Sequence, residues 1–165
     1  MKNVLVVTLM AGLTGLLGCG SDGADAVMPE LRGEVGAQGL TLTGESGGAL
    51  EGVRLSIAPG VLSEGAVVTV SLADERAALP EGALRIGPQV RIAATADMVL
   101  GPMDLELPFD ESKVVEHDQD ETMVKVWFLG PDKWSLIEPT GSRSNQVQLQ
   151  VDSFAVYATG LKLSN

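Results

Sequence analysis

The chain contains Val147-Gln148-Leu149-Gln150-Val151, in which apolar and polar residues alternate without a break. Side chains of a β-strand point alternately to its two faces, so this run predicts a strand with one buried and one solvated face. The same period of two recurs over residues 40–43, 53–57, 68–72, 90–92, 103–107, 124–128 and 154–157.

Glycine and proline turns separate these runs, as in Gly87-Pro88 and Gly101-Pro102. No stretch has a convincing helical stripe, and residues 74–79 (DERAAL) suffice for one helical turn at most. One-sided alternation is typical of antiparallel sheets with wet outer faces. The sequence therefore predicts an all-β fold, an antiparallel β-sandwich of about eight or nine strands over residues 39–165.

The first residues have the parts of an export signal: Lys2, then an uncharged run over residues 4–17, then a small residue, Gly18. The run is shorter than the roughly 20 apolar residues that cross a bilayer and falls in the range of about 7–15 that secretory signals use. Leu16-Leu17-Gly18-Cys19 resembles the lipobox of bacterial lipoproteins. That resemblance implies cleavage between Gly18 and Cys19 and acylation of Cys19, palmitate included.

We therefore predict a lipoprotein signal peptide over residues 1–18 and a lipidated cysteine with a flexible tether over 19–38. Cys19 is the only cysteine, so lipidation leaves no thiol for disulfides or metals. Two acyl chains hold a protein stably on a membrane. Gly20 stands where an aspartate favours the inner membrane in enteric bacteria, and this favours the outer membrane.

The excess of acidic residues limits which partners the protein can bind. Eleven basic residues face 22 acidic ones, a formal net charge of −11, and loss of Lys2 with the signal makes it one unit more negative. Such a surface is repelled by phosphate backbones and anionic headgroups. We expect no nucleic-acid partner, and the lipid on Cys19 must provide the attachment to the membrane.

Several motifs together resemble the ZU domain of zonula occludens proteins, ankyrins and netrin receptors. They are Gly47-Gly48-Ala49-Leu50, residues 53–62 (VRLSIAPGVL), Gly87-Pro88-Gln89-Val90, residues 101–108 (GPMDLELP) and residues 151–157 (VDSFAVY). The resemblance covers residues 39–160. It implies a β-sandwich that serves as an interaction or structural unit.

Some ZU relatives cleave their own backbone at a His-Phe-Ser or Ser-Phe-Ser site, where the final serine hydroxyl attacks the preceding carbonyl. The matching residues here are Ser153, Phe154 and Ala155. Alanine has no hydroxyl, and Ser153 lies on the wrong side of the bond. We therefore predict that this position is degenerate and that the chain does not cleave itself.

The densest charge cluster lies at residues 110–121 (DESKVVEHDQDE). Asp118, Asp120 and Glu121 offer oxygen ligands to calcium, but the D-x-[DN]-x-[DN]-G spacing of a calcium loop is missing. His117, the only histidine, is flanked by acids and is a candidate general base. We interpret the stretch as a solvated loop between two strands.

Trp127 and Trp134 lie on or beside predicted strands, so we expect them to pack, although an exposed Trp134 would offer a platform for carbohydrate. We predict no catalytic, cofactor or metal residues and a non-enzymatic module whose partners are the membrane and an envelope protein or glycan. Two alternatives stay open: an envelope hydrolase using the acidic loop and His117, and a glycan- or calcium-binding module.

Overall fold

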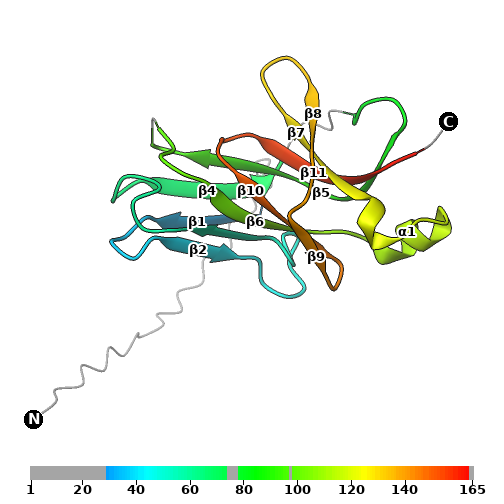
Figure 1. The fold of residues 1–165 in the computed structure, drawn as a ribbon. Helices are drawn as coiled ribbons and strands as arrows, with labels where there is room; N and C mark the ends of the chain where they lie inside the picture. The colour runs from blue at the N-terminus through cyan, green and yellow to red at the C-terminus, as the bar shows by residue number, and fades with distance from the viewer. Residues whose placement is uncertain (1–28, 74–77, 97, 164–165) are drawn as a thin grey trace, which may run out of the picture.

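The computed structural model describes residues 29–73, 78–96 and 98–163. It confirms the predicted fold class, because the described chain forms two antiparallel sheets packed face to face (Figure 1). The described residues form eleven strands, two or three more than expected.

The larger sheet has six strands and the smaller one five, and every pairing is antiparallel. In spatial order the larger sheet contains β1 (Glu30–Glu34), β4 (Val67–Leu72), β5 (Ala83–Ala94), β11 (Val156–Lys162), β7 (Val124–Leu129) and β8 (Trp134–Ile137). The smaller sheet contains β2 (Leu40–Thr43), β3 (Arg54–Ile57), β6 (Met103–Pro108), β10 (Gln146–Val151) and β9 (Gly141–Arg143).

The core lies between the two sheets and consists of the inward-facing residues of the alternating strands. In β10 the buried residues are Val147, Leu149 and Val151, and the glutamines between them face outward. The largest fully buried side chain is Tyr157 of β11, the strand near the middle of the larger sheet. Burial of one large apolar side chain contributes about 1.5–3 kcal/mol. The residues that produce the alternating pattern therefore also stabilise the sandwich.

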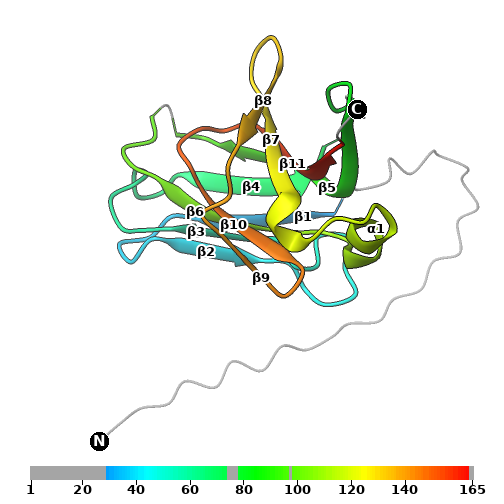
Figure 2. The same cartoon turned by 45° about the vertical axis from the view of Figure 1, so that its right-hand side comes forward.

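The chain crosses between the sheets at both sides of the sandwich. On one side β1 leads into β2 through a tight turn, in which the amides of Gly36 and Gly39 each donate to the other's carbonyl. On the other side β8 leads into β9 through residues 138–140. Figure 2 shows the two layers from a second direction. The four edge strands are therefore β1 and β8 in the larger sheet, and β2 and β9 in the smaller one.

The tether prediction over residues 19–38 was too long at its C-terminal end. Residues 30–34 form β1, which pairs with β4. The sequence has no apolar alternation here because Gly33 occupies an inward position. A Cβ at Gly33 would come within 2.8 Å of the Leu40 side chain, so glycine allows β1 and β2 to approach closely.

Residues 110–121 join β6 to β7 and are mostly exposed, as predicted, but they are not all loop. The segment contains helix α1 (Glu111–Glu116), followed by a 3-10 turn (Glu121–Met123) that leads into β7. Val114 is the only buried residue of α1, so the helix has no apolar stripe that periodicity could detect. Asp110, whose side chain accepts a hydrogen bond from the Ser112 amide, was the available N-cap signal.

The predicted signal peptide and Cys19 lie outside the described residues, as do residues 74–77 of the DERAAL stretch. No helix in the described part of the chain has both the length and the apolar character that a membrane crossing requires.

Candidate functional site

The β7–β8 hairpin forms one edge of the larger sheet. Its turn is Pro131-Asp132, and the Gly130 amide donates to the Lys133 carbonyl at 3.1 Å. Opposed residues of an antiparallel pair alternate between hydrogen-bonded and non-bonded. Since Gly130 and Lys133 form a bonded pair, Ser135 and Ile137 bond to β7, while the amides and carbonyls of Trp134 and Leu136 point away from it.

The outer face of this edge is apolar. Trp134 stands opposite Leu129, and Leu136 stands opposite Trp127. Leu136 is 43% exposed and Trp134 is half-buried, whereas Trp127 is almost fully covered. Because opposed residues point to the same face, these four side chains form one apolar strip across β7 and β8. We call it the β8 strip.

Trp127 packs over a glycine of the neighbouring strand. A Cβ at Gly160 would lie 2.9 Å from the Trp127 ring and 3.1 Å from the Leu79 side chain. Any larger residue at position 160 would therefore displace the indole ring. A groove of about 240 Å³ borders the β8 strip, lined by Pro80, Glu81, Gly82, Ala83, Trp127, Trp134, Leu136 and Lys162.

A second, wider groove of about 720 Å³ lies beside the same hairpin. It is lined by residues 91–94 of β5, residues 128–131 of β7 and its turn, and residues 153–156. Ser153, Phe154 and Ala155, which the sequence predicts to be a degenerate self-cleavage position, therefore lie beside the β7–β8 hairpin. The Ala155 carbonyl accepts a hydrogen bond from the Ile92 amide at 2.9 Å. Absence of self-cleavage stays a prediction.

Tyr157 holds the chain next to this wider groove. Its hydroxyl donates to the Ser153 carbonyl at 2.8 Å and lies 3.0 Å from the Ser153 hydroxyl. Burial raises the pKa of Tyr157, the Ser153 hydroxyl partly offsets this by lowering it, and the charge of Asp152 raises it further. The phenol therefore stays protonated and holds Ser153 against the start of β11.

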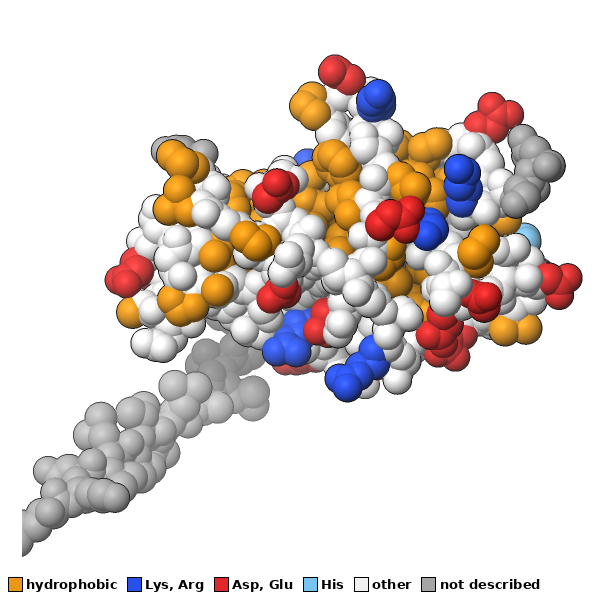
Figure 3. Space-filling model, in the orientation of Figure 1, with side chains coloured by type: hydrophobic (Ala, Val, Ile, Leu, Met, Phe, Trp, Pro, Cys, Tyr) orange, Lys and Arg blue, Asp and Glu red, His pale blue; other side chains and the backbone are white. Residues whose placement is uncertain are grey.

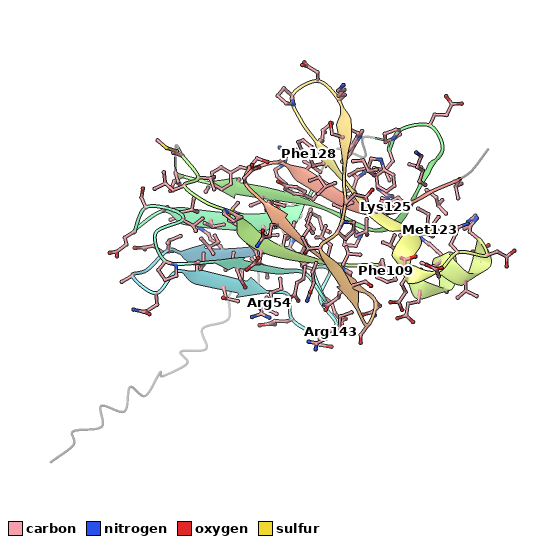
Figure 4. All side chains as sticks on the ribbon, viewed as in Figure 1. Arg54, Phe109, Met123, Lys125, Phe128 and Arg143 are labelled. Carbon is pink, nitrogen blue, oxygen red and sulfur yellow. The ribbon has the colours of Figure 1, made fainter. Side chains whose placement is uncertain are left out.

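Figure 3 shows hydrophobic side chains gathered around the β7–β8 hairpin in the middle of the viewed face, with charged side chains around them. Near the end of β8, Lys125 pairs with Glu138 at 2.6 Å, and Figure 4 shows Lys125 and Phe128 along β7. The strip is thus bordered by a satisfied ion pair.

The acidic stretch does not converge on a reactive centre. Asp110 caps α1 and Asp120 caps the 3-10 turn by accepting from the amide and hydroxyl of Thr122. These hydrogen bonds, from Ser112 and Thr122 respectively, lower the pKa of each carboxyl group. His117 ends α1 as an exposed residue and lines neither groove beside β8.

The calcium candidates Asp118, Asp120 and Glu121 are all exposed. Asp118 has a positive φ of 52° at the end of the helix, where the chain turns. Among the described residues there is no group of three or more histidine, cysteine, aspartate or glutamate side chains arranged to hold a metal ion.

A polar hollow of about 450 Å³ lies on the outer face of the smaller sheet. Its side chains already bind one another: Arg54 pairs with Glu106 at 3.7 Å, and Gln150 donates to Asp104 at 3.3 Å. The other lining residues are Ser56, Leu105, Thr140, Gln148 and Leu149, so no aromatic ring is present. A ligand would have to compete with these internal contacts, and we regard this hollow as a solvated face.

Sequence reasoning placed Trp134 beside a hairpin turn but missed β8, because Trp-Ser-Leu-Ile does not alternate. The signal that was available was the Gly130-Pro131-Asp132-Lys133 turn itself, since a turn that directly follows one strand favours a partner strand after it. Sequence reasoning also did not reveal that this edge combines the apolar β8 strip with backbone groups that point away from β7.

Together these features define an antiparallel β-sandwich protein with an apolar edge strand as its candidate binding site. Searches with protein-family models and against curated proteins found no match to the chain.

Proposed function

We propose that this protein is a lipoprotein of the bacterial cell envelope, cleaved before Cys19 and anchored by acyl chains on that residue. Its β-sandwich acts as a non-enzymatic interaction module. The single observation that carries the module is the β8 strip, since an exposed apolar surface joined to unpaired strand backbone favours a protein contact. The lipobox-like Leu16-Leu17-Gly18-Cys19 carries the anchor.

The spacing between the anchor and the fold supports a module held close to the bilayer. Ten residues separate Cys19 from Glu30, the first residue of β1. A fully extended chain covers at most about 3.3–3.6 Å per residue, so the sandwich would lie within about 35 Å of the lipid. The anchor joins the chain at β1, and β8 is the opposite edge of the same sheet. Outer-membrane attachment belongs to the same proposal, on the ground of Gly20.

The test of the anchor is labelling with an alkyne analogue of palmitate, comparing the wild-type chain with Cys19→Ser. We expect the wild type to be labelled, to fractionate with outer membranes and to lose residues 1–18, and Cys19→Ser to be unlabelled and unprocessed. Equal labelling of both, or a soluble wild-type protein, would contradict the proposal. A mature chain that splits after Phe154 on a denaturing gel would contradict the absence of self-cleavage.

A second candidate function is glycan binding, favoured by the half-buried Trp134 indole, which shares the smaller groove with Glu81 and Lys162. Aromatic rings stack on sugar faces, and flanking charged groups hydrogen-bond hydroxyls. Titration with soluble peptidoglycan fragments should then change tryptophan fluorescence in a saturable way that Trp134→Ala removes. A signal that does not saturate would exclude this candidate.

A further inference from the structure

We propose that β8 is a docking strand: it takes up an extended segment of another polypeptide as an additional strand of the six-stranded sheet. The segment would be basic at its ends and would place apolar side chains on the β8 strip. This inference rests on the proposed interaction module and names its site and the chemistry of its partner.

The backbone of β8 is the first support. Trp134 and Leu136 present amides and carbonyls that no strand in the described part of the chain meets. An extended peptide backbone offers the complementary donors and acceptors at the same spacing, which neither a helix nor a compact ligand does. The unpaired edge therefore selects for an extended polypeptide.

The side chains are the second support. Strand addition would place every other side chain of the incoming segment on the outer face of the sheet, beside Trp134 and Leu136. Those positions border the apolar groove lined by Trp127. An apolar residue seated there would cover the exposed part of Leu136, while the alternate positions would face Ser135 and Ile137 on the inner side.

The other three edges are protected or polar, and this contrast is the third support. β1 presents Glu30, Arg32 and Glu34, all exposed, and β2 presents threonines. β9 has only three residues. Charged side chains and short strands are the usual means of blocking edge-to-edge pairing. β8 has neither lysine nor proline between Trp134 and Ile137, and among the described edge strands it alone carries an exposed large apolar side chain.

Charge and area favour a foreign segment over a second copy of this chain. The chain carries a formal net charge of −11, so two copies repel each other while a basic segment is attracted. Pairing two four-residue strands would bury far less than the roughly 1,200–2,000 Å² of a stable interface between folded proteins. A short flexible peptide does not need an interface of that size.

The test uses the full chain in mild detergent and a fluorescent probe peptide, Lys-Lys-Val-Thr-Val-Thr-Val-Lys-Lys, followed by fluorescence anisotropy. Two N-methylated versions block either the amides of the three valines or those of the two threonines. Because one set faces the docking strand and the other faces solvent, we expect one version to bind like the parent and the other to lose binding. Equal binding of both versions would overturn strand addition.

Two proline variants provide the matched comparison. Leu136→Pro and Arg32→Pro each replace an edge residue whose amide points away from its neighbouring strand. We expect Leu136→Pro to weaken probe binding at least about tenfold and Arg32→Pro to leave it unchanged within about twofold. If Leu136→Pro fails to fold by circular dichroism, Leu136→Lys serves instead, since its charge repels the basic probe.

The other possible results of these experiments also decide whether β8 is a docking strand. No binding by the wild type at millimolar probe, or equal losses in the two proline variants, would overturn the docking strand. A dimer that light scattering detects and Leu136→Pro abolishes would assign the edge to a second copy and also overturn it. Because these measurements are made in detergent, they are independent of palmitate labelling, so loss of the docking strand and loss of the lipid anchor are separately visible.

Discussion

The two edges of the six-stranded sheet have the same backbone geometry and opposite side chains. In β1 the residues whose amides face outward from the sheet are Glu30, Arg32 and Glu34, and their exposed side chains are charged. In β8 the equivalent residues are Trp134 and Leu136, and their side chains are apolar. Backbone position alone therefore does not decide whether an edge is open to a partner.

The difference shows where this fold blocks strand pairing and where it permits it. A charged edge costs little in stability because its side chains stay in water, but an approaching strand would have to desolvate them. The β1 edge is also the one that the proposed anchor joins. The β8 edge carries no such cost, and this separates an inert edge from a binding edge within one sheet.

The largest expected effect separates the two kinds of position within β8. Ser135→Pro removes an amide that bonds to β7 and leaves the Phe128 carbonyl unpaired. We expect it to lower the free energy of unfolding by about 2–4 kcal/mol. Leu136→Pro, whose amide faces outward, should cost no more than about 1 kcal/mol. Urea unfolding measures both, and equal losses would contradict the assigned hydrogen-bond register.

The second prediction tests the packing behind the β8 strip. Gly160→Ala places a Cβ 2.7 Å from the Leu84 carbonyl and 2.9 Å from the Trp127 ring, so we expect a loss of about 1–3 kcal/mol and a red-shifted tryptophan emission. The control is Gly36→Ala beside β1, where the nearest atom to a new Cβ is 4.0 Å away. A stable, unshifted Gly160→Ala would show that the indole does not depend on this glycine.

The third prediction concerns Tyr157 of β11, whose hydroxyl holds Ser153 beside the wider groove. Tyr157→Phe removes the hydrogen bond to the Ser153 carbonyl and should lower the free energy of unfolding by about 0.5–1.5 kcal/mol. Burial raises the pKa of Tyr157 in the folded protein, so folding favours its protonated form. The wild type should therefore lose stability as the pH rises above about 10, and Tyr157→Phe should lose less. Identical alkaline profiles would contradict this.

The smallest effect on stability is expected from exchanging the character of the two edges. Arg32→Val with Glu34→Val makes β1 apolar, and Leu136→Lys gives β8 a charge. Both should change the free energy of unfolding by no more than about 0.5 kcal/mol because the side chains are exposed. Anisotropy should nevertheless show that the β1 variant gains a second binding site for the probe peptide and that the β8 variant loses binding. A β1 variant that binds no more probe than the wild type would show that charge is not what protects β1.

Sequence alone was sufficient for the fold class because the central strands alternate strictly, as Val147–Val151 does, and alternation reports directly which side chains face the core. It was insufficient at the two edges of the six-stranded sheet, although the edge strand β2 of the smaller sheet does alternate. β1 carries Gly33 at an inward position and β8 reads Trp-Ser-Leu-Ile, so neither alternates. β1 and β8 are each held by one neighbouring strand, and β1 also by its close approach to β2; neither feature leaves a local period in their sequences.

Only part of the candidate site could be predicted from the sequence, for the same reason. Trp134 could be identified as loop-adjacent, but its cross-strand neighbours and its outward-facing amide depend on the register with β7. His117 and the acidic residues attracted a chemical interpretation because they are adjacent in sequence. The structure instead uses Asp110 and Asp120 as caps of two short helical turns, a role that depends on single hydrogen bonds.

The most direct test of β8 as the open edge is residue-resolved amide hydrogen exchange, measured with and without the valine–threonine probe peptide. We expect the Trp134 and Leu136 amides to exchange rapidly in the free protein, and those of Ser135 and Ile137 slowly. The probe should slow Trp134 and Leu136 at least about tenfold and leave Arg32 and Glu34 of β1 unchanged. Slow exchange at Trp134 and Leu136 without the probe, or equal protection of both edges by it, would contradict β8 as the open edge.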